Sequence, residues 1–277
     1  MKAIFLGGDV RQKYACDFLN INNIVSECYT SFNSNSNIHN LIMDASVIAL
    51  PIPITKSDNY LNTIDDGKIE IYDILSLLRE HHILFGGRIS DPIKNYLLNH
   101  NIKYIDYMDI ESFQIKNALL SAEGAIYYAQ GRINSGISDL EIAIFGFGRI
   151  GKILAYLLHT KGAKITVFAR KESDFAWCQL IGLKAVKILG NMISSDILEK
   201  NYDIVFNTIP YRIIDERFAK NINTDTIIID LASYPYGMDE SIAKKYNLKY
   251  YHELGIPGRY APESAGKIIG EIILNYI

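Results

Sequence analysis

Three glycines, Gly146, Gly148 and Gly151, have the G-x-G-x-x-G spacing of a loop whose backbone approaches a pyrophosphate. The first glycine permits a tight turn, the second leaves room for the phosphates, and the third lets a helix pack closely on a strand. The apolar residues 141–145 before them predict a buried strand. Apolar residues after them recur at helical spacing: Ile150, Ile153, Leu154, Leu157 and Leu158. The pattern predicts a strand–turn–helix unit that binds a dinucleotide.

The end of the next predicted strand, residues 164–169, indicates which dinucleotide binds. The preceding helix is expected to stop at Gly162. NAD-specific members of this fold usually carry an acidic residue about 20 residues after the glycine motif. This chain has Arg170 and Lys171 there, and both could pair with a ribose 2′-phosphate. The sequence therefore favours NADP over NAD.

Polar residues at the ends of later strands are predicted to surround the nicotinamide. Ligands in open α/β sheets bind at the carboxyl ends of the strands, and predicted strands 203–206 and 226–231 both end in such residues. Ordinary turn chemistry is the alternative explanation for Asn, Thr, Pro and Ser. The predicted cofactor-binding residues are Gly146, Gly148, Arg149, Ile150, Gly151, Arg170, Lys171, Asn207, Thr208, Pro210, Leu231 and Ser233.

Three arginines, Arg11, Arg88 and Arg259, are suited to bidentate hydrogen bonding with a carboxylate, and the alternative explanation for each is a solvated surface charge. Glycine pairs at two predicted strand ends, residues 7–8 and 86–87, suggest that a ligand approaches the backbone closely. The predicted substrate-binding residues are Gly8, Asp9, Arg11, Pro51, Gly87, Arg88, Pro257, Gly258, Arg259 and Ser264.

The catalytic residue is not assigned, and the candidates are Glu123, Ser233 and His252. Glu123 could be a base, a hydrogen-bond acceptor or an exposed helix carboxylate. His252 lies at the end of a predicted strand, where a histidine packed at a turn is an equal explanation. None of the six histidines has metal-ligand spacing with a Cys, Asp or Glu, so no metal site is expected.

The elements that must position these residues alternate between strand and helix. In the first half the predicted strands are 2–6, 46–50 and 82–85, and the predicted helices are 11–20, 71–79 and 91–99, with Ser31 to Asn37 as a loop. In the second half, helices 173–181 and 239–245 alternate with strands 203–206, 226–231 and 248–252, and residues 255–262 form a loop. The fold class is α/β: two doubly wound Rossmann-like domains with a cleft between them, as in D-2-hydroxyacid dehydrogenases.

The expected domain organisation has four parts. They are an N-terminal substrate-side α/β domain at 1–115, a bridging helix at 116–137, an NADP-binding Rossmann domain at 138–260 and a C-terminal helix at 261–277 that packs back toward the first domain. The sequence is expected to be helical from about Glu111 to Gly131, with one apolar face made of Ile115, Leu119, Ala122, Ile126 and Ala129.

Composition excludes several classes of protein. The 277 residues are 49% hydrophobic, enough for two cores, and the net charge of −3 with scattered cations does not favour nucleic acid or an anionic membrane. Cys16, Cys28 and Cys178 form no C-x-x-C motif, which suits a reducing cytosol. The first apolar run is too short for a signal peptide, and no run reaches the length of a membrane span. We therefore expect a cytoplasmic protein.

The chain resembles, from end to end, the A-chain family of dipicolinate synthase, the enzyme of spore-forming bacteria that makes pyridine-2,6-dicarboxylate. The glycine motif is generic, whereas the D-L-A-S and G-x-P-G segments are specific. The segments that carry the resemblance are GGDVRQ at 7–12, ALPIP at 49–53, GG at 86–87, SAEGAI at 121–126, GFGRIGK at 146–152, NTIP at 207–210, IDLASYPYGMD at 229–239 and LGIPGRYAPESAGKII at 254–269.

The resemblance implies NADP-dependent oxidation of dihydrodipicolinate to dipicolinate during sporulation, in the mother-cell cytoplasm. It also implies a flavoprotein-like partner, the second subunit of dipicolinate synthase, and it leaves homo-oligomerisation open. Tyr234 and Tyr236 lie where other members tend to have Arg and Gly, so the residue that contacts substrate there is not implied. The reaction makes an aromatic ring, so the protein mainly has to hold a dicarboxylate against the nicotinamide.

Two alternatives stay open. A D-2-hydroxyacid dehydrogenase would need an Arg after the strand ending at Ala232 and a catalytic His in the loop near 256–258, but Ser233 and Pro257 stand in these regions. A non-catalytic NADP-binding subunit of a synthase complex would keep the cofactor motif and leave the chemistry to its partner.

Overall fold

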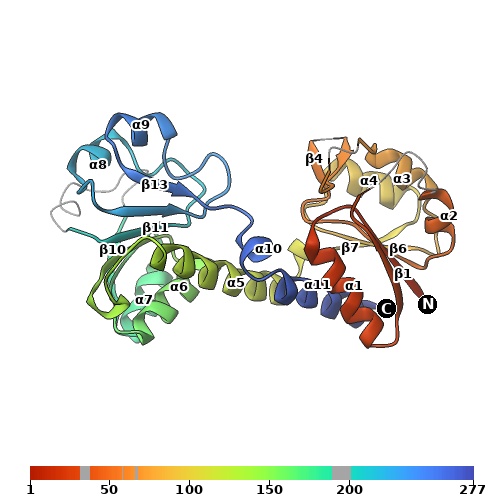
Figure 1. Ribbon diagram of the computed structural model, residues 1–277, viewed down its shortest axis with the longest axis horizontal. Coiled ribbons are helices and arrows are strands. Elements are labelled where there is room, and N and C mark those ends of the chain that lie inside the picture. Colours follow the sequence, from red (N-terminus) through yellow and green to blue (C-terminus); the bar gives the residue numbers. More distant parts are fainter. Residues whose placement is uncertain (32–37, 58, 66–67, 189–200) are drawn as a thin grey trace. The chain divides into compact units, whose positions relative to one another are not determined.

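The computed structural model describes residues 1–31, 38–57, 59–65, 68–188 and 201–277 (Figure 1). The chain divides into two compact units: unit 1 is Met1–Asn117 with Pro257–Ile277, and unit 2 is Ala118–Ile256. Of the loop expected at residues 31–37, all but Ser31 lies outside the described residues. Among the described residues, no helix is both long and apolar enough to cross a membrane.

Unit 1 contains a five-stranded parallel sheet with the order β2-β1-β3-β6-β7. Its strands are β1 (Lys2–Leu6), β2 (Val25–Tyr29), β3 (Val47–Ala49), β6 (Ile83–Gly86) and β7 (Lys103–Asp106). Its other elements are α1 (Val10–Ile21), α2 (Ile38–Met43), the hairpin β4 (Thr55–Ser57) and β5 (Tyr60–Leu61), α3 (Ile71–Leu77), α4 (Asp91–Asn99) and the 3-10 turn η1 (Tyr107–Asp109).

Alternation along the strands divides the core of unit 1 between the two faces of its sheet. Ile4 and Leu6 of β1 pack with buried residues of α2, α3 and α4. Ala3 and Phe5 of the same strand pack on the other face with buried residues of α1 and α11 (Pro262–Tyr276). The central strands are buried on both faces, as in other doubly wound folds.

Helix α11 lies alongside α1 although the two are far apart in sequence (Figure 1). Gly266 and Gly270 make this close packing feasible. A Cβ atom at Gly266 would lie 2.5 Å from the Arg11 carbonyl oxygen, and one at Gly270 would lie 2.6 Å from the Phe18 ring. Ile273 of α11 is fully buried in the core that it shares with α1.

Unit 2 contains a six-stranded parallel sheet with the order β10-β9-β8-β11-β12-β13, the strand order of a dinucleotide-binding fold. Its strands are β8 (Glu141–Phe145), β9 (Lys164–Ala169), β10 (Lys184–Lys187), β11 (Ile204–Asn207), β12 (Ile227–Asp230) and β13 (Lys249–His252). Its helices include α6 (Arg149–Thr160), α7 (Glu172–Leu180), α8 (Glu216–Asn221) and α9 (Glu240–Lys245). The predicted α/β class with two Rossmann-like sheets is confirmed.

One segment differs from the sequence-based expectation, and the helix expected from about Glu111 to Gly131 is present. The loop expected at 255–262 contains a short helix, α10 (Ile256–Tyr260), and α11 already begins at Pro262. Helix α5 runs from Glu111 to Gln130, begins in unit 1 and ends in unit 2. It stops before a Gly- and Ser-containing stretch that includes the 3-10 turn η2 (Ile137–Asp139). The apolar face of α5 buries Ile126 and Ala129 but leaves Ile115 exposed.

Candidate functional site

The glycine turn between β8 and α6 has two closed positions and one open position. Gly146 has φ of +95°, and a Cβ atom there would lie 2.4 Å from the Thr208 hydroxyl oxygen. A Cβ atom at Gly151 would lie 2.2 Å from the Gly146 carbonyl oxygen. By contrast, a Cβ atom at Gly148 would meet nothing within 4 Å. The tight turn at Gly146 and the close helix–strand approach at Gly151 are therefore confirmed, and Gly148 is the position with free space for a ligand.

Gly148 is also the N-cap of α6, a helix of 12 residues that ends as predicted before Gly162, whose φ is +86°. The first amides of a helix have no partner within it and carry partial positive charge. Gly148 and Arg149 are exposed, whereas Ile150 is half-buried. The turn thus presents the N-terminus of α6 to solvent through a position without a side chain, which is the arrangement that binds phosphate groups.

The end of β9 lies beside this turn, because the Gly146 amide donates to the Phe168 carbonyl oxygen at 2.9 Å. Arg170 and Lys171 follow directly and are exposed. The nearest carboxylate after them, Glu172, forms an ion pair with Lys187 of β10. Two cations therefore stand beside the glycine turn, and the nearby carboxylate is already paired.

Asn207 and Asp230, at the ends of β11 and β12, form a fully buried pair. The Asn207 Nδ2 donates to Asp230 Oδ1 at 2.8 Å and to the Ile209 carbonyl oxygen at 3.1 Å, and Asn207 Oδ1 accepts from the Ile209 amide. Thr208, which is half-buried, donates its hydroxyl to the Phe145 carbonyl oxygen at 2.9 Å. The side chains of Asn207 and Thr208 are therefore engaged in shaping the turn, and Pro210 beyond them is exposed.

Asp230 was not among the residues predicted from the sequence, yet it has the densest set of donors at this sheet edge. Besides Asn207, its carboxylate accepts from the amides of Ala232 at 3.0 Å and Gly237 at 2.6 Å and from the Tyr250 hydroxyl at 2.6 Å. Burial, and then the bond to Asp230, raise the pKa of Tyr250 well above its usual range, so the hydroxyl stays a donor. Asp230 thereby fixes both ends of the loop from residue 231 to 238.

Two catalytic candidates lie near this loop. Ser233 is exposed on it, and Leu231 before it is half-buried. The His252 ring packs against Tyr236 with 3.8 Å between ring centroids, and its Nε2 lies 3.2 Å from the Ala232 carbonyl oxygen. That contact places the proton of the neutral ring on Nε2 and the lone pair on Nδ1. Glu123, the third candidate, is half-buried on α5.

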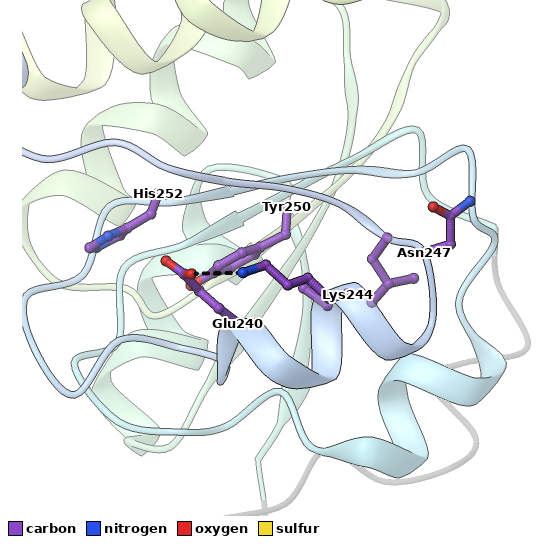
Figure 2. Close-up of a pocket in the computed structure, with 7 residues that line it drawn as sticks. Glu240, Lys244, Asn247, Tyr250 and His252 are labelled. Atoms are coloured by element: carbon purple, nitrogen blue, oxygen red, sulfur yellow. Dashed lines mark ion pairs between the residues drawn. The ribbon is translucent and has the colours of Figure 1, made fainter.

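A pocket of about 430 Å³ is lined by residues of α9, of β13 and of the turn between them (Figure 2). Figure 2 shows the ion pair of Glu240 and Lys244 beside Tyr250 and His252. The sheet order places β11 and β12 between β13 and the glycine strand β8. The pocket is therefore distinct from the glycine turn. Among the described residues, no group of three or more His, Cys, Asp and Glu side chains could hold a metal ion.

In unit 1 the glycine pairs have a different explanation from the one expected. The Gly8 amide donates to the Asn62 carbonyl oxygen at 2.6 Å, and the Gly87 amide donates to the Pro51 carbonyl oxygen at 3.1 Å. A Cβ atom at Gly87 would lie 2.6 Å from Ile52. The chain segment that follows β3 approaches these glycines closely, which by itself accounts for the lack of a side chain at both positions. Gly8, Pro51 and Gly87 are buried.

The three candidate arginines differ in what they contact. Arg11 is paired with Asp9 through two bonds of 2.8 Å, Nε to Oδ1 and Nη2 to Oδ2, and Nη2 also donates to the Ile52 carbonyl oxygen at 3.2 Å. Arg11 is therefore already part of an ion pair. Arg88 and Arg259 are exposed. The remaining predicted residues of this group are the buried Pro257, the half-buried Gly258 and the exposed Ser264.

Arg88 has an unusual backbone, with φ of +56° at the end of β6. The buried Asp106 of β7 holds this turn: its carboxylate accepts from the amides of Arg88 at 3.1 Å, Ile89 at 2.8 Å and Met108 at 2.8 Å. A non-glycine residue in the left-handed region persists only where its surroundings determine it. The Asp106 contacts thus set the direction in which the Arg88 side chain leaves the sheet edge.

Comparisons with known proteins agree with this architecture. The family model for the N-terminal domain of the dipicolinate synthase A chain matches residues 2–108. The dipicolinate synthase A chain of Bacillus subtilis (strain 168) is 27% identical over 228 residues, which are 82% of this chain and 75% of that protein. The crystal structure of the Bacillus subtilis dipicolinate synthase A chain is similar with a TM-score of 0.83 at 25% identity, covering 99% of this chain and 95% of that one.

The fold is also that of D-lactate dehydrogenases. A D-lactate dehydrogenase from Lactobacillus jensenii, solved with NAD+, is similar with a TM-score of 0.65 at 12% identity, covering 99% of this chain and 95% of that one. At this identity the similarity concerns the fold alone.

Proposed function

Since this chain is a relative of the dipicolinate synthase A chain, with residues 2–108 belonging to the family of its N-terminal domain, we propose that it oxidises dihydrodipicolinate to dipicolinate with NADP. The observation that carries the proposal is the glycine turn that is closed by packing at Gly146 and Gly151 and open at Gly148. The proposal includes action with a second subunit, since the relative is named as one component of a synthase.

In this proposal unit 2 holds the dinucleotide. The open turn at Gly148 and the first amides of α6 bind the pyrophosphate. Arg170 and Lys171 pair with the 2′-phosphate. NADP supplies the hydride acceptor when bound. The loop that Asp230 fixes lies at the carboxyl end of the sheet, where ligands of this fold bind, so its backbone and Ser233 are proposed to position the nicotinamide.

The substrate is proposed to be held by carboxylate-binding groups of unit 1. Arg88 is exposed and its backbone is fixed by Asp106, so it can meet a carboxylate in a defined direction. Removal of a hydride and a proton from the ring gives an aromatic product, which supplies driving force without a strong base. Glu123, Ser233 and His252 remain the candidates for accepting the proton.

Turnover tests this proposal. The purified chain is mixed with NADP and enzymatically generated dihydrodipicolinate, with and without the partner subunit, and NADPH and pyridinedicarboxylate absorbance are followed. We expect equal amounts of the two products. Formation only with the partner would mean that the partner completes the site. No formation in either mixture, with NADPH still bound, would contradict the proposal and favour the non-catalytic subunit.

The same assay with pyruvate and other 2-oxo acids plus NADPH tests the second candidate, a D-2-hydroxyacid dehydrogenase, which the fold of the Lactobacillus jensenii enzyme favours. We expect no turnover, because Ser233 and Pro257 stand where that chemistry needs an arginine and a histidine.

Cofactor preference gives a sharper prediction. Arg170→Asp is expected to weaken NADPH binding roughly tenfold or more, because a hydrogen bond to a charged group contributes about 1.5–3 kcal/mol. NADH has no 2′-phosphate and should lose much less. Fluorescence titration of both dinucleotides measures the two changes. Lys161→Asp, at the opposite end of α6 from the glycine turn, makes the same charge change and should alter neither affinity strongly. Equal losses for NADPH and NADH in Arg170→Asp would contradict the assignment of the 2′-phosphate site.

A further inference from the structure

Gln12 is a buried amide without a hydrogen-bond partner. It lies in the first turn of α1, the residue is 2% exposed, and neither Nε2 nor Oε1 bonds to any group in the described part of the chain. Buried polar groups in folded proteins are nearly always paired, because an unpaired one has lost its bonds to water without replacement. The proposed function gives Gln12 no role, so its burial needs an explanation.

The amide borders a small cavity at the carboxyl end of the unit 1 sheet. The cavity has a volume of about 10 Å³, which is room for roughly one water-sized group. Its walls are formed by Asp9, Arg11, Gln12, Pro51, Ile52 and Ile269. The polar part of this wall is therefore one carboxylate, one guanidinium and the unpaired amide.

The Asp9 carboxylate binds the Arg11 guanidinium in the way that the carboxylate of a ligand could. Asp9 N-caps α1 by accepting from the Arg11 amide at 3.0 Å, and its carboxylate binds the Arg11 guanidinium through two atoms. The carboxylate is the outer partner, with 41% of its side chain exposed, and the guanidinium is the inner one, with 15% exposed. Burial opposes ionisation of Asp9, but the bonds and charge of Arg11 lower its pKa overall, so the carboxylate is charged at neutral pH.

Gly258 of α10 packs directly against this pair. A Cβ atom there would lie 3.0 Å from Arg11 Nε and 3.3 Å from Asp9 Oδ2. A side chain at position 258 would therefore press on both charged groups. The pair is neutral overall, so a carboxylate that replaces Asp9 on Arg11 preserves the charge balance of the inner site and moves Asp9 outward into water.

We propose that Gln12 is a ligand-binding residue, whose amide bonds a ring dicarboxylate when one of its carboxylates replaces Asp9 on Arg11. In dihydrodipicolinate the ring nitrogen beside a carboxylate is an imine without hydrogen, so the nitrogen and the carboxylate are both acceptors, which the two N–H groups of Gln12 Nε2 can meet. The ligand class is thus a six-membered nitrogen ring with a carboxylate beside the nitrogen. This inference rests on the proposed function for the nature of the ring, but its test does not require turnover.

The test combines stability with binding in the full chain. Gln12→Met keeps the unbranched stem and removes the unpaired amide, so the melting temperature without ligand is expected to rise. Affinity for pyridine-2,6-dicarboxylate, measured by calorimetry, is expected to fall tenfold or more. The matched control is Gln114→Met, since the Gln114 amide donates to the Met108 carbonyl oxygen at 2.6 Å. That variant is expected to lose stability and to keep the affinity.

The outcomes separate the explanations. Unchanged affinity in Gln12→Met, or no binding of this dicarboxylate by the unaltered chain, would overturn the proposal and leave a buried water as the partner of the amide. If Gln12→Met does not fold, Gln12→Glu serves instead: a carboxylate of the same length should compete with the ligand and weaken binding at least as much.

Asp9→Asn tests the replacement of Asp9 by the ligand. The variant keeps the helix cap, weakens the bond to Arg11 and should tighten ligand binding severalfold; weaker binding would contradict the replacement of Asp9. A chain that binds through Gln12 but does not oxidise dihydrodipicolinate would refute the proposed function alone.

Discussion

Gly148→Val is expected to abolish binding of NADPH and NADH while the protein remains folded. Position 148 has an extended backbone, with φ of −76° and ψ of −164°, and a Cβ atom there meets nothing within 4 Å. The valine side chain would fill the space before the N-terminus of α6, where the pyrophosphate is proposed to lie. Fluorescence titration measures the loss, and circular dichroism with thermal unfolding checks the fold.

The control for this prediction is the third glycine of the same motif. Gly151→Ala would put a Cβ atom 2.2 Å from the Gly146 carbonyl oxygen, so strand and helix must move apart. We expect a loss of stability of about 1–3 kcal/mol, as for other overpacked sites. Gly148→Val should thus lose dinucleotide binding without a loss of stability, and Gly151→Ala should lose stability. Unchanged dinucleotide affinity in Gly148→Val would mean that the motif is only a turn.

Asp230→Ala is expected to cause the largest loss of stability in unit 2. The substitution leaves the Asn207 amide, the Tyr250 hydroxyl and the amides of Ala232 and Gly237 without their acceptor. Each buried donor left unpaired costs about 1–3 kcal/mol, so the total should exceed the roughly 1 kcal/mol typical of point mutations. Urea unfolding followed by circular dichroism measures it.

Asp225→Ala provides the comparison for Asp230. Its carboxylate is 83% exposed and pairs with Lys249 on the surface, so its removal should change stability little. Similar unfolding midpoints for the two variants would show that the Asp230 bonds contribute no more than a surface pair. If Asp230→Ala also weakens dinucleotide binding more than its stability loss explains, the loop from residue 231 to 238 is part of the cofactor site.

The sequence predicted the interior of both sheets better than their edges. Strands β1, β3, β8, β11 and β12 are buried on both faces and read as continuous apolar runs. Three of the four edge strands, β2, β7 and β10, were not predicted, because polar residues interrupt their sequences VSECY, KYID and KAVK. The fourth, β13, was predicted. Helix α10 was missed because its Pro and Gly are typical of loops.

At the candidate site, too, some features could be predicted from the sequence and others could not. Spacing alone identified the glycine turn, since its three positions lie within six residues. Spacing could not show that Asn207 points inward, because its partner Asp230 is 23 residues away and closes the network only when β11 and β12 pair. Gln12 had no sequence signal beyond its place in GGDVRQ, and the cavity that it borders is lined by residues far apart in the sequence, including Ile269 of α11.

The packing of α11 on α1 also sets an order of events during synthesis on the ribosome. Unit 2 is one continuous stretch, Ala118–Ile256, so all of it has been synthesised before the last segment of unit 1 is made. Until Pro257–Ile277 follows, Ala15 and Leu19 of α1 lack the isoleucines of α11 that cover them. The first unit to begin is therefore the last to be completed, and the nascent chain carries an uncovered apolar helix face throughout the translation of unit 2.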